Sequence, residues 1–336
     1  MDVSDLDYPL PEAAIAQKPA KSRDGARLLV DRGASRAPSH LRISDLPEVL
    51  RSGDLLVVND SRVLPARLHL RKPSGGGVEV LLLEHAGNGT WEALVRPSRR
   101  VGAGQRLTGG GDVVVEVVSE LGEGRWRVAV TGDIEAGGEM PLPPYIRTTL
   151  AEPERYQTVY ARRPVSAAAP TAGLHLTTDV LARCRANGIE VAPIELAIGL
   201  DTFRPVTTDT LEEHVIHSEA YDVPPATLEA CAKARRVVAV GTTVVRALES
   251  AAATGACRGR TSLFIRPGFE FRVVDVLLTN FHLPRTTLLA MVEAFVGRRW
   301  RELYDTALRE GYRFLSFGDA MLVERERRRG ERRAEP

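Results

Sequence analysis

Residues 54–60 read Asp-Leu-Leu-Val-Val-Asn-Asp and are the clearest marker of the architecture. The centre of this stretch is continuously apolar and rich in β-branched side chains, which is typical of a strand buried on both faces of a parallel sheet. A polar cluster, residues 59–62, follows at once. Because open α/β sheets bind ligands beyond the carboxyl ends of their strands, the stretch predicts a central strand that ends at a binding site.

Segments of the same kind recur along the chain on both sides of a long glycine-rich region. One further strand is expected before that region, at residues 27–31. After it, the apolar patterns predict strands and helices in alternation, with strands at residues 189–198, 237–243, 263–266, 272–278 and 312–316, and helices at residues 180–186, 225–236, 244–253, 286–296 and 301–309. Such alternation predicts a layered α/β domain.

The glycine-rich region between these segments has a different pattern. It contains short runs of alternating apolar and polar residues separated by glycine-rich turns, at residues 67–71, 78–84, 91–95, 113–118 and 126–130. This pattern predicts a small antiparallel β-barrel. We therefore expect a discontinuous α/β catalytic domain, residues 1–64 and 143–336, into which a β-barrel domain of residues 65–142 is inserted.

Composition narrows the class of protein. A length of 336 residues favours two domains, and 43% hydrophobic with 26% charged residues is typical of a globular protein. The sequence has no long apolar run and no recognisable leader, so we expect a cytoplasmic protein that does not contact a membrane. The net charge of +1 means that a nucleic-acid partner would have to bind local basic patches.

Four polar clusters are candidates for a site. Besides residues 59–62, they are residues 170–177 (PTAGLHLT), residues 279–284 (TNFHLP), and Gly241-Thr242-Thr243 with Arg246 one turn further on. Small and hydroxyl residues at the start of a helix favour the binding of an anion. His175 is the only side chain in its cluster that titrates near neutral pH.

Several common classes of site are disfavoured. His214 and His217 are three residues apart and raise the question of a metal, but the spacing is not His-Glu-x-x-His and no third ligand is evident nearby. Three distant cysteines, Cys184, Cys231 and Cys257, indicate neither a zinc site nor disulfides. No Gly-rich dinucleotide, nucleophile-elbow or Walker motif occurs. We expect no metal.

Taken together, the clusters resemble a known family. Eight motifs occur in the order seen in S-adenosylmethionine:tRNA ribosyltransferase-isomerases of queuosine biosynthesis, and they lie at residues 53–68, 140–146, 155–160, 170–177, 213–219, 240–250, 279–284 and 312–322. That family has an α/β domain with an inserted β-barrel. The resemblance implies transfer and isomerisation of the ribosyl moiety of S-adenosylmethionine onto 7-aminomethyl-7-deazaguanine at the tRNA wobble position, which gives epoxyqueuosine and releases adenine and methionine.

This reaction implies roles for the clusters. A base must remove a proton from the carbon beside the sulfonium, and adenine leaves more easily when an acid protonates it. Imidazoles suit such proton transfer, so the catalytic candidates are His175, His282 and then His217. The substrate-binding candidates are Asp60 and Arg62 for the deazaguanine or ribose, Thr242, Thr243 and Arg246 for the methionine carboxylate, and also Thr171, Gly173, Gly241 and Asn280.

Structural roles remain open for some of these residues. Asp60 alternatively caps a turn, Arg246 alternatively pairs with Glu249, and His282 is alternatively a packing residue. The implied partners are the anticodon stem-loop of tRNA and S-adenosylmethionine, which is a co-substrate, so no cofactor is expected. We expect a monomer.

The sequence departs from the family pattern at Ala26, at residues 165–167 and in the segment of residues 196–203. Relatives usually read Leu-His-Val-Gly-x-Gly-Thr-Phe where this chain has Ala197 in place of the histidine and Asp201 in place of a glycine. The first change removes a proton carrier, and the second adds a charge. An alternative function therefore stays open, in which a diverged relative binds RNA or a nucleoside without completing the transfer, or uses another acceptor.

Overall fold

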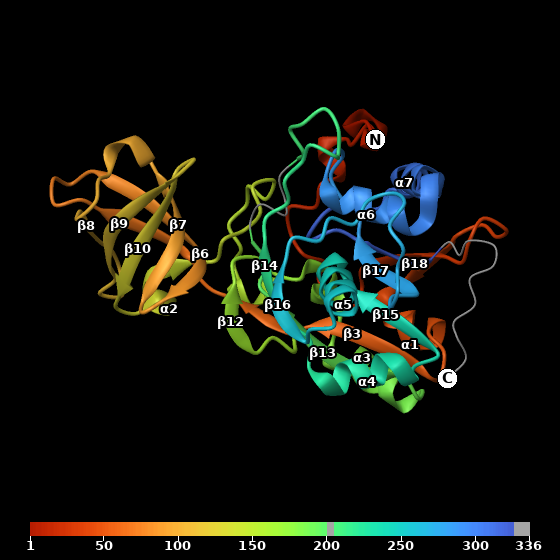
Figure 1. Ribbon diagram of the computed structural model, residues 1–336. Coiled ribbons are helices and arrows are strands. Elements are labelled where there is room, and N and C mark those ends of the chain that lie inside the picture. The colour runs from red at the N-terminus through yellow and green to blue at the C-terminus, as the bar shows by residue number, and fades with distance from the viewer. Residues whose placement is uncertain (200–204, 326–336) are drawn as a thin grey trace. The chain divides into compact units, whose positions relative to one another are not determined.

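The computed structural model describes residues 1–199 and 205–325 (Figure 1). Its α/β part is built on a sheet of nine strands in the order β16-β14-β13-β3-β15-β17-β18-β1-β2. These strands are β1 (Arg27–Asp31), β2 (Ser39–Arg42), β3 (Asp54–Asn59), β13 (Glu190–Leu196), β14 (Glu219–Asp222), β15 (Arg236–Val240), β16 (Arg258–Thr261), β17 (Val276–Asn280) and β18 (Ala320–Glu324).

Strand β3 lies in the middle of this sheet. It pairs in parallel with β13 on one side and with β15 on the other, and every residue of β3 is buried. β17 continues the parallel order beyond β15. The outer strands include antiparallel neighbours, since β14 runs against β13 and β18 runs against β17. The predicted central, buried strand at residues 54–60 is confirmed.

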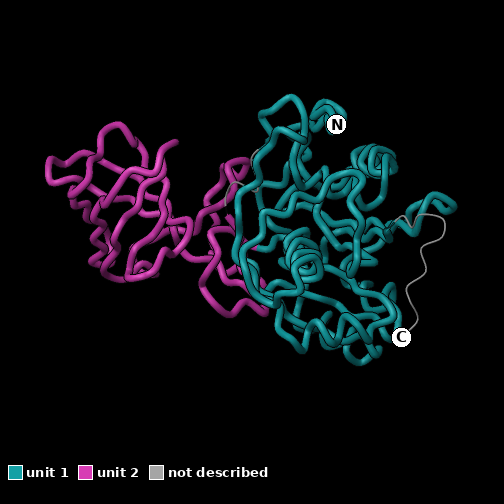
Figure 2. Tube along the Cα trace, in the orientation of Figure 1, with its two compact units in different colours: residues 1–59, 170–196, 202–336 teal, residues 60–169, 197–201 magenta. Residues whose placement is uncertain are grey.

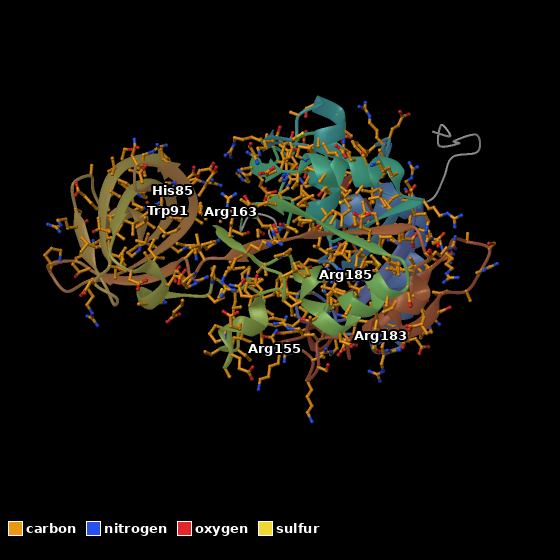
Figure 3. All side chains as sticks on the ribbon, turned by 90° about the horizontal axis from the view of Figure 1, so that it is seen from below. His85, Trp91, Arg155, Arg163, Arg183 and Arg185 are labelled. Carbon is orange, nitrogen blue, oxygen red and sulfur yellow. The ribbon has the colours of Figure 1, made fainter. Side chains whose placement is uncertain are left out.

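Helices cover both faces of the sheet. They are α1 (Leu46–Val49), α3 (Thr178–Ala186), α4 (Pro225–Lys233), α5 (Thr242–Thr254), α6 (Thr287–Val296) and α7 (Trp300–Arg309), with the 3-10 turns η1 (Val3–Leu6), η2 (Glu12–Ala14), η3 (Ile43–Asp45), η6 (Thr171–His175) and η8 (Gly297–Arg299). Figure 1 shows α3 and α4 on one side of β3 and α5 on the other. The guanidinium of Arg183 in α3, which Figure 3 labels, donates a hydrogen bond to the carboxylate of Glu48 in α1 at 2.7 Å. The layered α/β fold is confirmed.

Two of the expected strands are wrong, and four strands of the large sheet, β2, β14, β16 and β18, were missed. Residues 263–266 and 312–316 form no strand, whereas β18 pairs with both β17 and β1. The segment at residues 312–316 turns back on itself because Leu315 has a φ of +69°. Its apolar rings pack against other aromatic rings, as Phe314 does on Phe281 with centroids 4.8 Å apart. Apolar content there reflects this cluster and not strand pairing.

The remainder of the chain forms a second compact unit, residues 60–169 and 197–201 (Figure 2). Six of its strands follow one another in the order β5-β6-β7-β10-β9-β8, and β8 pairs back with β5 and closes a barrel. The strands of this unit are β4 (Ser61–Val63), β5 (Arg67–Arg71), β6 (Gly77–Gly87), β7 (Thr90–Arg96), β8 (Arg106–Thr108), β9 (Val114–Gly122), β10 (Arg125–Thr131), β11 (Gly138–Glu139) and β12 (Arg163–Ser166), with the helical turns η4 (Ser98–Arg100), α2 (Ile134–Gly137) and η5 (Pro153–Tyr156).

Alternating side chains fill the barrel, as its sequence pattern predicts. Every second residue of β5 is buried, and Trp126 of β10 lies in the core with its indole N–H donating to the Ser98 hydroxyl at 2.9 Å. Trp91 is only half-buried and meets His85 edge to face, with ring centroids 4.9 Å apart (Figure 3). All barrel strands fall inside the expected insert of residues 65–142, but the compact unit that contains them extends beyond it at both ends.

The described residues contain no helix that is long and apolar enough to cross a membrane.

Candidate active site

The carboxyl ends of the parallel strands bring several polar clusters to one edge of the large sheet. Val240 of β15 pairs with Leu278 of β17, so Thr242, which follows β15, and Asn280, the last residue of β17, lie at the same edge. Asn59 ends β3 at this edge beside β13. Strand β14 is antiparallel to β13, and its first residue, Glu219, therefore lies beyond the end of β13. The expected location of the site is thus an edge where the fold places polar residues.

Three predicted residues contact one another directly at this edge. His175, in η6, is only 4% exposed, and its Nε2 lies 2.9 Å from Nδ2 of Asn280. The Thr171 hydroxyl, from the same turn, donates to Oδ1 of Asn280 at 3.2 Å. Residues more than 100 positions apart in the sequence are therefore joined in one buried cluster.

The environment of His175 keeps its imidazole neutral. Burial, together with the charges of Arg313 and Arg23, lowers the pKa of His175 to about 4. Arg23 reaches this turn, where its guanidinium donates to the carbonyl of Leu174 at 3.0 Å. At neutral pH this side chain exchanges hydrogen bonds as an uncharged imidazole.

Three hydrogen bonds hold His282 within the protein. Its Nε2 lies 2.9 Å from the Thr279 hydroxyl, its backbone N–H donates to the Tyr304 hydroxyl at 3.0 Å, and its carbonyl accepts from Tyr8. Burial lowers the pKa of His282 to about 3. These contacts account for a packing role of His282, the alternative left open by the sequence.

The start of α5 faces the turn that carries His175. Gly241 has a φ of +93° and a ψ of 156°, and a Cβ there would lie 3.5 Å from the side chain of Ala172. Thr242 and Thr243 follow as the first residues of a helix of 13 residues, whose free N–H groups attract negative charge. Gly173 is buried in η6 and is not among the glycines of positive φ.

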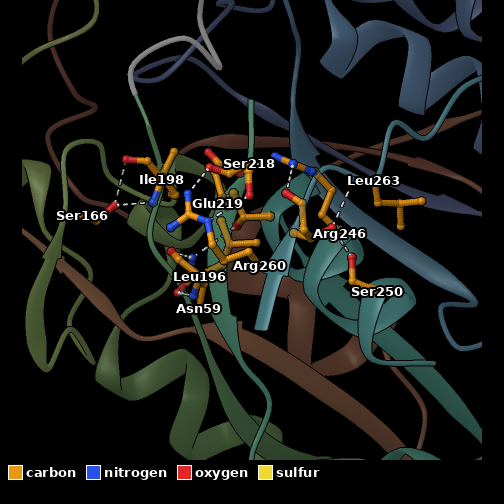
Figure 4. Close-up of polar contacts among 12 residues, drawn as sticks. Asn59, Ser166, Leu196, Ile198, Ser218, Glu219, Arg246, Ser250, Arg260 and Leu263 are labelled. Carbon is orange, nitrogen blue, oxygen red and sulfur yellow. Dashed lines mark hydrogen bonds and ion pairs between the residues drawn. The ribbon is translucent and has the colours of Figure 1, made fainter. Parts of the chain in front are cut away.

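Arg246 is not available to a ligand as the sequence suggested. Its guanidinium forms a buried ion pair with Glu219 and also approaches the carbonyl of Thr261 at 3.4 Å (Figure 4). The alternative partner, Glu249, is wrong, because its carboxylate accepts the backbone N–H groups of Arg272, Val273 and Val274. Arg246 is therefore paired inside the protein, and the other groups at the start of α5 that attract negative charge are its backbone N–H groups.

The other candidates belong to different segments of the chain. Asp60 and Arg62 belong to the second compact unit, where Asp60 faces Arg162 at 3.6 Å and Arg62 pairs with Glu154. His217 is exposed on the segment before β14. Ala197 is half-buried in the second unit, and Asp201 lies outside the described residues. Among the described residues, no group of three or more His, Cys, Asp or Glu side chains could hold a metal ion.

One part of the site was missed from the sequence. The carbonyls of Leu315 and Asp319 accept hydrogen bonds from Nδ2 of Asn280 at 3.2 and 3.4 Å. Leu315 lies in the segment that was expected to be a strand, residues 312–316, and Asp319 lies three residues beyond it. The only signal for this turn is the Phe-Gly-Asp sequence at residues 317–319, since glycine next to aspartate favours a turn.

Comparison with known proteins agrees with this architecture. The chain matches the family described as queuosine biosynthesis protein over residues 3–323. It is 54% identical over 327 residues to the S-adenosylmethionine:tRNA ribosyltransferase-isomerase of Rubrobacter xylanophilus, which covers 96% of this chain and 98% of that protein. A protein of the same name from Thermus thermophilus is 51% identical over 340 residues, with 94% of this chain and 98% of that protein covered.

A crystal structure gives the same result. The S-adenosylmethionine tRNA ribosyltransferase of Thermotoga maritima superposes with a TM-score of 0.55 at 35% identity, and the match covers 95% of this chain and all of that one (100%). With fold, length and motifs in agreement, the chain belongs to the queuosine biosynthesis family of S-adenosylmethionine:tRNA ribosyltransferase-isomerases.

Proposed function

We propose that this chain transfers and isomerises the ribosyl moiety of S-adenosylmethionine onto 7-aminomethyl-7-deazaguanine at the wobble position of tRNA. The products are epoxyqueuosine in tRNA, adenine and methionine. The observation that carries the proposal is near full-length identity of 54% to a protein named for this activity. The buried cluster at the sheet edge is where we propose that the chemistry occurs.

The start of α5 is the proposed site for the methionine carboxylate. Thr242 and Thr243 stand at the amino end of a long helix, where unpaired N–H groups and the helix dipole favour an anion. Gly241 lets the chain enter the helix at a φ of +93° and leaves room beside Ala172 for a ligand to approach the backbone. Since Arg246 is paired with Glu219, its role is to hold the helix against β14.

We propose that His175 contacts the reacting part of the substrate. The Thr171–Asn280–His175 cluster lies next to the start of α5, because Ala172 is within contact distance of Gly241. A buried neutral imidazole can orient a polar substrate atom without adding charge. His282 has a packing role in this proposal, since its Nε2 contacts the Thr279 hydroxyl of β17. The exposed His217 is the remaining candidate for proton transfer with solvent.

The partners follow from the reaction. Asp60 and Arg62 are proposed to contact the deazaguanine or the ribose, and the wider partner is the anticodon stem-loop of tRNA. S-adenosylmethionine acts as a co-substrate, so the proposal requires no cofactor. We propose a monomer that works in the cytoplasm, where tRNA is modified.

The test is a transfer assay with defined substrates. The protein is incubated with S-adenosylmethionine and tRNA that carries 7-aminomethyl-7-deazaguanine, and adenine release is measured by chromatography. Adenine should appear only when both substrates are present. His175→Gln should lower the rate by about 10²–10³-fold, whereas the matched control His69→Gln, on the barrel surface, should leave it unchanged. No adenine release by the wild-type protein would contradict the proposal.

A further inference from the structure

Both ends of the Asn280 side-chain amide, Oδ1 and Nδ2, form hydrogen bonds within the protein. It is 2% exposed, and four groups surround the amide: the Thr171 hydroxyl at 3.2 Å from Oδ1, and His175 Nε2 at 2.9 Å, the Leu315 carbonyl at 3.2 Å and the Asp319 carbonyl at 3.4 Å from Nδ2. The NH₂ group has no hydrogen left to offer a substrate, and Oδ1 keeps only one free lone pair. These contacts point to a role for Asn280 within the protein, besides the proposed contact with substrate.

The surrounding groups fix which way the amide points. Backbone carbonyls can only accept hydrogen bonds, so Leu315 and Asp319 must face the NH₂ group of Asn280 and not its oxygen. The oxygen then accepts from Thr171. In this orientation the NH₂ group also faces Nε2 of His175, and a hydrogen bond forms only if that nitrogen carries no proton. A neutral His175 must therefore carry its proton on Nδ1.

We propose that Asn280 is a positioning residue that sets the tautomer of His175, so that His175 presents Nδ1–H and acts as a hydrogen-bond donor toward the substrate. Within the described part of the chain, Nδ1 has no hydrogen-bond partner. The identity of the atom that receives this hydrogen bond rests on the proposed function. The tautomer itself does not.

The proposal limits what His175 can do in the reaction. A bare nitrogen facing the substrate is what a general base requires, and here the bare nitrogen faces Asn280. Complete transfer of the Nδ1 proton would leave an imidazolate, so His175 donates a hydrogen bond and keeps its proton. The base that removes the proton beside the sulfonium must accordingly be another group.

Three features of the turn at residues 315–319 fix the positions of the Leu315 and Asp319 carbonyls. Leu315 has a φ of +69°, a left-handed conformation that residues with a side chain rarely adopt. Gly318 packs so closely that a Cβ would lie 2.4 Å from the carbonyl oxygen of Arg313. The buried carboxylate of Asp319 accepts the backbone N–H groups of Arg27 at 2.9 Å and Arg313 at 2.8 Å. These contacts keep both carbonyls aimed at Asn280.

The tautomer can be measured directly on the free protein. Full-length protein labelled with ¹⁵N-histidine gives long-range ¹H–¹⁵N spectra in which protonated and bare ring nitrogens have clearly different shifts, and His175→Gln assigns the signal. At neutral pH the proposal predicts a proton on Nδ1 and a bare Nε2. A proton on Nε2 of wild-type His175 would overturn it.

Substitution of Asn280 tests whether this residue sets the tautomer of His175. In Asn280→Asp the carboxylate can only accept, so the proton should move to Nε2 and the pKa of His175 should rise, because the new charge favours imidazolium. The kcat should fall by about 10²–10³-fold, and the ionisation of His175 should enter its pH profile. The matched control Asn187→Asp, at the exposed end of α3, should change none of these.

The two proposals fail separately. The spectra need neither S-adenosylmethionine nor tRNA, so a protein with the predicted tautomer but no adenine release would contradict the proposed function alone. A tautomer that stays on Nδ1 in folded Asn280→Asp would overturn the role of Asn280 and leave the transfer reaction untouched. If that variant does not fold, the wild-type spectrum decides.

Discussion

Arg246 of α5 and Glu219 of β14 form an ion pair in which the two side chains are only 8% and 7% exposed. The pair ties the helix whose amino end we assign to substrate binding to the outer strands of the sheet (Figure 4). Removing one partner of a buried ion pair leaves the other charge buried and uncompensated, which lowers the free energy of unfolding by about 3–5 kcal/mol.

The first prediction concerns this pair. Arg246→Met and Glu219→Met should each lower the free energy of unfolding by about 3–5 kcal/mol, and the double variant Arg246→Met/Glu219→Met should lose less than the sum. Urea unfolding of the four proteins measures the coupling. Additive losses would show that the two charges do not depend on each other.

The pH dependence of stability provides a second prediction. Burial lowers the pKa values of His175 and His282 to about 4 and about 3, from 6.5 in the unfolded chain. The unfolded state therefore binds these protons first as the pH falls. Stability should be unaffected above pH 6.5 and should decrease between pH 6.5 and 4 by about 3 kcal/mol for His175 and somewhat more for His282.

Variants separate these two histidines from the carboxylates that also titrate in acid. His175→Gln and His282→Gln should each flatten the loss of stability between pH 6.5 and 4. His69→Gln is the control, because His69 is 57% exposed on the barrel. Urea unfolding at several pH values gives the slopes, and equal slopes for wild type and His175→Gln would show that His175 is not held neutral by burial.

The glycine at the start of α5 supports a third prediction. Gly241 has a φ of +93° with a ψ of 156°, a region that only glycine adopts readily, so Gly241→Ala should cost about 1–3 kcal/mol. Gly255→Ala, at the other end of the same helix with a φ of +71°, should also destabilise. Only Gly241→Ala should weaken binding of S-adenosylmethionine in calorimetry; equal affinity in both variants would argue against the proposed carboxylate site.

The barrel offers a fourth prediction. Trp126 is 5% exposed in the barrel core, so Trp126→Ala should destabilise the protein by about 3–5 kcal/mol. Ser98→Ala removes only the hydrogen bond to the indole N–H and should cost about 1 kcal/mol. Trp91→Ala, at a half-buried position, should cost less than Trp126→Ala in thermal unfolding, and the reverse order would contradict this packing.

Much of the fold is local enough to predict from the sequence. The continuous apolar run of β3 reflects burial on both faces of the sheet, and the alternating run of β5 reflects burial on one face only. Both patterns can be seen in the sequence residue by residue. Residues 312–316 do not form the expected strand, because their aromatic side chains pack in a cluster just before a left-handed turn at Leu315. Nothing in the local pattern distinguishes that case from a strand.

The site was predictable in its members but not in their partners. The motifs placed His175, Thr171 and Asn280 near one another, and the register of β15 and β17 explains why. That Arg246 pairs with Glu219, and that Asn280 is held by two carbonyls from a distant turn, depends on contacts between segments that are far apart in sequence. Such pairings follow from tertiary packing, which single residues do not encode.

The departures at Ala197 and Asp201 remain a question for experiment. If they abolished the transfer, Ala197→His with Asp201→Gly should create turnover that the wild-type protein lacks. We predict the opposite, namely that wild-type protein is already active, because the relatives that it matches over nearly their whole length all carry the transferase name.

The most direct test of the central claim follows the ribosyl group itself. S-adenosylmethionine labelled with ¹³C in its ribose is incubated with the protein and tRNA that carries 7-aminomethyl-7-deazaguanine, and the digested tRNA is analysed by mass spectrometry. We predict a labelled epoxyqueuosine nucleoside in an amount equal to the adenine released. Adenine release without label in the tRNA, or no reaction at all, would contradict the claim.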